Sequence, residues 1–355
     1  MGSCFTTPKH TLRVIHCPKS CCNYPHQAIL ALTDPPSKLL VRSAKYERGA
    51  CYSKTMNRRK PFLPIPRQLD LLSSRGLTLP DREAVASFLM QHNYYRFSGY
   101  MRYFQVAPSH GNEDFDPNTH WDDIVEIYNF DVQLRALLLE GIHLAEISAR
   151  TAFAYSEANI HSPYEEYLAT DAYKRPPNPT IKATNELILS ELHRSREPYI
   201  AKFRKGCTDG NQLWTDDVPV WAAVETLSLG TLSKAISFRN DGNAVYQGTC
   251  KALGVGQPYL SPQLRSFTFI RNKCAHSSRL WNCFVVDPPR VPEGVKRRAE
   301  RLNGSYAGSS VFAVIVALDY FLFTTKLREG FLDEYLQLAS TSELFSQGIS
   351  HPRAS

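Results

Sequence analysis

The sequence predicts an all-α protein, and three observations lead to that prediction. Apolar residues recur at helical spacing over 120–159, which is the strongest periodic pattern in the chain. Alternating runs typical of β-strands are scarce, and no repeat of about 20–50 residues indicates a solenoid. The longest apolar run, Val311 to Leu318, is too short to cross a bilayer and is typical of a buried helix segment. With 43% hydrophobic residues in a chain of 355, the core can be substantial.

Residues 1–55 differ from the rest of the chain in composition. Residues 1–60 hold eleven Lys or Arg and two acidic residues, a net charge of +9, whereas the whole chain has +7. Residues 61–355 therefore carry a net charge of −2, so nucleic-acid binding there must depend on a local patch. Because residues 1–55 are rich in Pro, Cys and Ser without periodicity, we expect a disordered leader, with Met56 as an alternative start.

The cysteines and the N-terminus together indicate the compartment. Nine cysteines, an odd number, show no spacing typical of a disulfide framework. No apolar stretch precedes a small-residue cleavage site, so we expect a cytoplasmic protein without membrane contact. The string from His16-Cys17 to Cys21-Cys22 could hold zinc, but no second Cys/His pair follows at finger-like spacing. We therefore expect neither a metal nor another cofactor.

Order is expected from about Pro61, beginning with two short helices. The first covers 66–75 and has Gly76 as a C-terminal stop. The string from Thr78 to Asp81 then resembles a capping box before a second helix over 82–92.

The segment from Asn93 to Phe104 is rich in aromatic residues and holds two arginines. Aromatic side chains interleaved with basic ones can stack on nucleic-acid bases. The alternative is a helix or strand end that packs its aromatic side against the core. We favour the alternative, because aromatic side chains contribute large areas to protein cores.

The helix expected over 120–159 carries two acid-before-base pairs four residues apart. Asp131–Arg135 and Glu146–Arg150 have the orientation that supports a helix. Glu140 and Glu146 are six residues apart and lie on different faces, so we expect them to form ion pairs rather than an acid/base couple.

Proline-rich loops separate the remaining helices. Lys174 to Pro179 and Asp287 to Pro292 are predicted loops, because their prolines prevent continuous helix. The expected helices are 184–202 with a kink or an end at Pro198, 218–236, 258–283 and 311–338. The prediction is one helical domain over 56–345 with a disordered tail over 346–355.

The candidate catalytic residues lie in the helix expected over 258–283. Arg271 is the only arginine in the chain with a histidine four to six residues after it, and that histidine is His276. RNA carries its own nucleophile, the 2′-hydroxyl, and histidine, with a usual pKa of about 6.5, can take that proton or protonate the leaving 5′-oxygen. Arg271 can hold phosphate oxygens as negative charge develops. Asn272 could orient the imidazole or hold a phosphate oxygen.

Three further residues of this segment have two interpretations each. Lys273 and Arg279 are candidates for RNA binding through phosphate, although solvated charge explains them about as well. Trp281 is interpreted as a core anchor rather than as a platform for base stacking.

Helical geometry limits how these side chains can act together. On a continuous helix Asn272, His276, Arg279 and Cys283 would share a face. Arg271 and His276 are five residues apart and differ by about 140° around the axis. The pair could flank one cleft, or two copies of the chain could build a composite cleft across a symmetric dimer.

Six short strings along the chain carry a resemblance to known proteins: Gln68 to Gly76, Asn93 to Tyr100, Tyr128 to Arg135, Ala145 to Arg150, Pro219 to Leu232 and Arg271 to Asn282. Together they cover about residues 60–340. In this order they resemble the Abi-like abortive-infection proteins of bacteria, within the HEPN superfamily.

The resemblance implies a HEPN-like helical bundle with extra N-terminal and inserted helices. It also implies a metal-independent endoribonuclease in phage defence or toxin–antitoxin control, which cleaves RNA as a homodimer and is restrained by an antitoxin, either a small RNA or a protein. The family's catalytic positions fall on Arg271, Asn272 and His276. Two departures are visible, because Ser277 stands where the family commonly has a second His and Cys283 where it often has Arg.

Two other readings compete with the ribonuclease. The departures at Ser277 and Cys283 motivate a non-catalytic RNA-binding regulatory module of the same fold. A structural protein that binds another protein through the Tyr-rich segment 93–104 is the reading we favour least.

Overall fold

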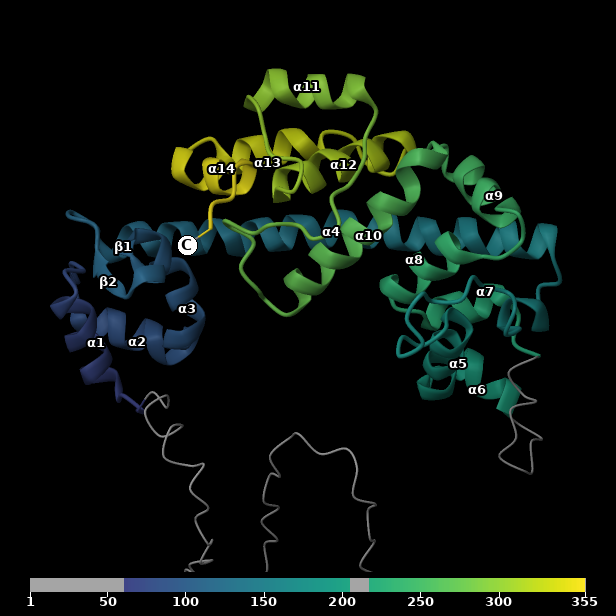
Figure 1. Cartoon of the computed structure of the whole chain (residues 1–355), viewed down its shortest axis with the longest axis horizontal. Helices are drawn as coiled ribbons and strands as arrows, with labels where there is room; N and C mark the ends of the chain where they lie inside the picture. Colours follow the sequence, from purple (N-terminus) through teal and green to yellow (C-terminus); the bar gives the residue numbers. More distant parts are fainter. Residues whose placement is uncertain (1–60, 205–216, 355) are drawn as a thin grey trace, which may run out of the picture. The chain divides into compact units, whose positions relative to one another are not determined.

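Fourteen α-helices make up most of the regular structure in the computed structural model, which describes residues 61–204 and 217–354 (Figure 1). Within those residues the strands are β1 (Gln105–Ala107) and β2 (Asn112–Phe115), which pair antiparallel. The prediction of an all-α protein is confirmed. Residues 62–355 form one compact unit. The predicted leader 1–55, the zinc string from His16 to Cys22 and the alternative start at Met56 lie outside the described residues.

Helix α4 (Trp121–Ile160) is the longest element, and most of the other helices pack against it. Its 40 residues extend for about 60 Å at the usual helical rise. Figure 1 shows α4 running behind the helices that cover it, and α9, α10, α12 and α13 all contact it. Ile124, Leu134 and Ile142 are fully buried along its apolar stripe. The helix predicted over 120–159 is therefore confirmed within one residue at each end.

Three helices precede α4. These are α1 (Ile65–Ser74), α2 (Arg82–His92) and α3 (Tyr94–Met101), which ends in a short 3₁₀ turn. The cap of α2 is the Asp81 carboxylate, which accepts hydrogen bonds from two backbone N–H groups of the first turn. Thr78 plays no part in that cap and instead pairs with His120. The predicted position of the helix is right, but the capping box that was expected to begin it is wrong.

The aromatic segment 93–104 belongs to the core. Phe97 and Tyr100 are buried, and the Phe97 ring contacts the rings of Phe88 and Trp121. The preference for a packing role over base stacking is confirmed for these residues. Tyr95 is the exception, because its side chain is 86% exposed.

Turns interrupt two of the longer predicted helices in the next part of the chain. The helix expected over 184–202 is split into α5 (Thr184–Arg194) and α6 (Pro198–Ala201), because Pro198 cannot continue an existing helix. The helix expected over 218–236 is split into α7 (Val220–Ala223) and α8 (Leu229–Phe238). Ser228 causes the second break, since its side chain caps α8. The sequence did not predict α9 (Ala244–Leu253).

The C-terminal helices are α10 (Gln257–Ala275), α11 (Glu293–Asn303), α12 (Val311–Thr324), α13 (Phe331–Ala339) and α14 (Glu343–Ser350). The helix expected over 311–338 is broken between α12 and α13, where Lys326 and Gly330 have positive φ. The expectation of a disordered tail over 346–355 does not hold for its first part, because α14 reaches Ser350 and the Ile349 side chain is fully buried. In the described part of the chain, no helix has the length and apolar character needed to cross a membrane.

Candidate functional site

The candidate catalytic residues lie at the C-terminal end of α10, which is shorter than predicted. The helix ends at Ala275 rather than Cys283, and His276 is its C-cap. The next residue, Ser277, has φ of 50°, in the left-handed region. The predicted face shared by Asn272, His276, Arg279 and Cys283 is therefore wrong beyond His276.

A double hydrogen bond closes this end of the helix. The Ser277 N–H donates to the Cys274 carbonyl at 2.9 Å, and the Ser278 N–H donates to the Lys273 carbonyl at 2.7 Å. This is the Schellman arrangement, which usually has glycine at the left-handed position. Serine at that position gave no sequence signal for a helix end.

The three predicted catalytic residues occupy the last turn and the cap of α10. Arg271 is half-buried, whereas Asn272 and His276 are exposed. The Arg271 Nη1 donates to the Asn272 Oδ1 at 3.4 Å. No residue in 61–204 or 217–354 hydrogen bonds to the His276 imidazole. One chain thus brings the three groups to the same helix end without fixing the imidazole against the guanidinium.

The two predicted RNA-binding residues contact the segment that follows the helix. The Lys273 Nζ donates to the Arg279 carbonyl at 3.3 Å. The Arg279 Nη1 donates to the Trp281 carbonyl at 2.8 Å, and its guanidinium lies 4.5 Å from the centre of the Tyr103 ring. Both side chains are half-buried and help to shape this segment, so RNA contact by either remains a prediction.

Asp131, on α4, is the main support of the segment after His276. Its side chain is fully buried. The carboxylate accepts hydrogen bonds from the Leu280 N–H at 3.1 Å, from the Trp281 N–H at 3.0 Å and from the Arg135 Nη1 at 2.6 Å. The Tyr100 hydroxyl is a fourth donor. Burial and the neighbouring Asp131 carboxylate raise the pKa of Tyr100, so the phenol keeps its proton and donates.

Two arginines extend this support towards the cap of α10. The Arg135 Nη1 also reaches the Ser278 carbonyl at 3.5 Å, and Arg96 of α3 donates to the Ser277 carbonyl. We call Asp131, Arg135, Tyr100 and Arg96 the clamp. Because the clamp holds backbone groups, it fixes the path of the chain directly after His276.

Sequence reasoning treated Asp131–Arg135 as a pair that supports a surface helix, and so missed the clamp. The available signal was position. Asp131 and Arg135 fall on the same stripe of α4 as Leu134 and Leu138, which are fully buried. Charged residues on an apolar stripe must find partners inside the protein.

The far end of the segment is held by α14 and the residues after it. The Trp281 side chain is buried and its Nε1 donates to the Leu344 carbonyl at 3.2 Å, so its role as a core anchor is confirmed. The Asn282 N–H donates to the Gly348 carbonyl at 3.0 Å, and its Oδ1 accepts from the Arg353 N–H at 3.1 Å. A side chain at Gly348 would collide with the Trp281 indole, which explains the glycine.

Two kinds of group bear on the chemistry that is available around the site, namely metal ligands and cysteine thiols. Within 61–204 and 217–354, no three His, Cys, Asp or Glu residues group together as a metal site would require. The buried thiols of Cys274 and Cys283 flank the candidate site, and burial raises the pKa of Cys274 to about 12.

Comparison with known proteins identifies the family to which the chain belongs. No curated protein and no solved structure matches the chain. A family model described as Abi-like protein matches residues 87–282. That range is more than half of the chain and contains both the clamp and the end of α10. The chain therefore belongs to the family of Abi-like proteins.

Proposed function

We propose that this protein is a metal-independent endoribonuclease of the HEPN type that acts in abortive infection or as a toxin. The observation that carries the proposal is the exposed end of α10, where Arg271, Asn272 and His276 stand together and the clamp holds the chain that follows. Membership of the Abi-like family supports the abortive-infection role. The proposed substrate is RNA, and the proposed compartment is the cytoplasm.

The chemistry uses the nucleophile that RNA carries. His276 takes the proton of a 2′-hydroxyl, and the 2′-oxygen attacks the adjacent phosphorus. Arg271 holds the non-bridging oxygens as negative charge develops on them, and Asn272 orients the phosphate or the imidazole. The bond between phosphorus and the 5′-oxygen breaks, and the leaving oxygen takes a proton from a second imidazole, the protonated His276 of another copy of the chain. The products end in a 2′,3′-cyclic phosphate and a 5′-hydroxyl.

A homodimer forms part of the proposal. The reaction needs a base and an acid, and one chain supplies a single His276 at this helix end. In the described residues nothing orients the imidazole, so a second copy is the proposed source of the partner groups. Light scattering tests this proposal, because a monomer with full cleavage activity would exclude a composite site.

The alternative is an RNA-binding regulatory module without turnover. The unsupported imidazole of His276 favours it, and so does Cys283, which is buried where the family often has an arginine that could reach RNA. In this interpretation the half-buried cations at the end of α10, Arg271 and Lys273, bind phosphate without cleaving it. An antitoxin, either a small RNA or a protein, is proposed only for the ribonuclease.

A cleavage assay separates the two candidates. The full chain is incubated with end-labelled RNA in EDTA, and the product ends are identified. We expect cleavage with cyclic phosphate ends, and its loss in Arg271→Ala and His276→Ala. The matched control is His143→Ala, which removes an exposed histidine of α4.

Each other outcome of the assay has a definite meaning. RNA binding without cleavage would favour the regulatory module. Activity that is lost in EDTA, restored by Mg²⁺ and accompanied by 5′-phosphate ends would replace the proposed mechanism with a metal nuclease. In cells, variants of Arg271 and His276 that are as toxic as the unaltered chain would exclude the assignment.

A further inference from the structure

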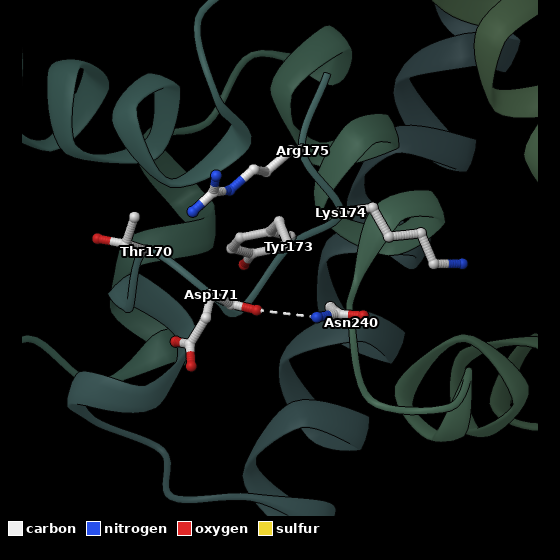
Figure 2. A pocket seen from close by; sticks show the side chains of 6 residues that line it. All are labelled: Thr170, Asp171, Tyr173, Lys174, Arg175 and Asn240. Carbon is white, nitrogen blue, oxygen red and sulfur yellow. Dashed lines mark hydrogen bonds between the residues drawn. The ribbon is translucent and has the colours of Figure 1, made fainter. Parts of the chain in front are cut away.

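A second candidate site lies in a pocket between the loop before α5 and Asn240. The pocket has a volume of about 690 Å³, which is within the usual range for small-molecule sites. All six lining residues have polar side chains, although much of the surface that they expose to the pocket is apolar, and two of them, Lys174 and Arg175, are exposed cations. The lining residues are Thr170, Asp171, Tyr173, Lys174, Arg175 and Asn240 (Figure 2).

Backbone pairing fixes the walls of this pocket. Tyr173 and Arg239 form an isolated antiparallel bridge. The Asn240 N–H donates to the Ala172 carbonyl at 2.8 Å, and the Asn240 Nδ2 donates to the Asp171 carbonyl at 3.2 Å (Figure 2). Because both walls are hydrogen bonded to each other, the pocket exists before any ligand binds.

A buried ion pair stabilises the same two segments of the chain. The Arg239 Nη2 donates to the Glu157 Oε1 at 2.6 Å, and the Glu157 side chain is fully buried. The Arg239 Nη1 donates to the Ala172 carbonyl at 2.9 Å, and the guanidinium lies 5.6 Å from the centre of the Tyr173 ring. A site that is already rigid loses little conformational entropy when a ligand binds.

The cations of the pocket are not neutralised by the protein around them. The Arg175 guanidinium has no hydrogen bond or ion pair with any residue in the described part of the chain. The Lys174 Nζ makes one long contact, 3.4 Å from the Asn243 Oδ1. Figure 2 shows the Asp171 carboxylate and the Lys174 ammonium both pointing away from the Arg175 guanidinium. A guanidinium without a protein partner at the lining of a pocket matches the geometry of phosphate oxygens.

We propose that this pocket binds a phosphate group, with Arg175 as its main contact. A free nucleotide and the backbone of an RNA strand both present this chemistry. The pocket is separate from the end of α10, because Asp131 of the clamp and Glu157 beneath the pocket are 26 residues apart on α4. At the helical rise that separation is about 39 Å, so the proposal does not depend on cleavage at His276.

Binding measurements on the full chain with His276→Ala test the proposal while any RNA stays intact. The probes are inorganic phosphate, adenosine 5′-monophosphate and a labelled RNA of 20 nucleotides, measured by calorimetry and fluorescence anisotropy. We expect Arg175→Ala to weaken by about tenfold the binding of whichever probe occupies the pocket, either phosphate and the nucleotide or the RNA. The reason is that the substitution removes a charge-assisted hydrogen bond to phosphate. The matched control is Arg297→Ala on α11, which removes an arginine whose side chain is 65% exposed.

The outcomes distinguish the two sources of phosphate and define failure. Loss of nucleotide binding with unchanged RNA affinity identifies a free nucleotide. Weaker RNA binding without measurable nucleotide binding identifies a strand phosphate, and loss of both identifies a site open to either. If Arg175→Ala changes none of these affinities, or if Arg297→Ala changes them equally, the proposal is wrong. Neither result bears on the cleavage assay, which depends on His276 and Arg271.

Discussion

Asp131→Asn tests whether the clamp positions the proposed catalytic end of α10. The substitution keeps the side chain's shape but removes its charge, so the amide can accept only through one oxygen. The Arg135 side chain, 8% exposed, then has no counter-charge, and at most one of the Leu280 and Trp281 N–H groups keeps a good acceptor. Removing one partner of a buried pair costs about 3–5 kcal/mol of unfolding free energy. For a folded unit of this size, the melting temperature should fall by roughly 10 °C.

The effect on cleavage is predicted separately from the effect on stability. A loop displaced by about 1 Å at a catalytic centre can lower a rate by about 100-fold. We expect such a loss in the single-turnover rate of Asp131→Asn, measured at a temperature where the variant is fully folded. In Asp131→Asn/Arg135→Met most of the stability should return, because no charge remains buried and unpaired, but the rate should stay low.

The matched control is the pair Glu146–Arg150, whose two residues, like Asp131 and Arg135, both lie on α4. Glu146→Gln disrupts the contact with Arg150, which holds the Val224 and Leu227 carbonyls rather than the segment after His276. It should lower stability and leave the proposed cleavage rate of the folded protein unchanged. A normal rate in Asp131→Asn, or an equal loss in Glu146→Gln, would refute the positioning role.

Three other predictions follow from the structure and the sequence. Gly348→Ala should lower the unfolding free energy by about 1–3 kcal/mol in urea titrations, because its methyl group would meet the Trp281 indole; an unchanged midpoint would show that the indole can move. Burial raises the pKa of Cys274 from 9.0 to about 12 in the folded protein. Between about pH 9 and pH 12 the thiol therefore ionises in the unfolded chain but not in the folded one, so the unfolding free energy is constant below about pH 9 and decreases as the pH rises through this range. Urea titrations at pH 8 and 10 should show this loss, and Cys274→Ala should reduce it. Deleting residues 1–55 should leave the melting temperature unchanged, and a large drop would contradict the prediction of a dispensable leader.

The sequence predicted elements well where burial is periodic, and poorly where a tertiary contact sets the outcome. α4 was found because its apolar stripe continues for 40 residues. α11 was missed because Ala299 is its only buried residue, so its pattern resembles that of a loop. The break between α12 and α13 was missed because apolar residues continue on both sides of Gly330.

The same distinction applies to the candidate site. The spacing of Arg271 and His276 selected these two residues as candidates, because that motif is local in the sequence. The C-terminal end of α10 was predicted at the wrong residue. Ser277 adopts a left-handed backbone conformation, which a serine in the sequence does not indicate. The support from Asp131 could not be read from spacing, because the carboxylate and the N–H of Leu280 are 149 positions apart.

The hydrogen bonds that α14 accepts from Trp281 and Asn282 can form only late in the synthesis of the chain. The ribosome makes Trp281 more than 60 residues before Leu344 and Gly348, whose carbonyls accept its indole N–H and the neighbouring backbone N–H. At about 5–20 residues per second, several seconds pass between the two. During that interval the nascent chain already carries Arg271 and His276 but lacks the contacts of Trp281 and Asn282 with α14. Under the proposed ribonuclease function, chains still on the ribosome would lack this support for the candidate site.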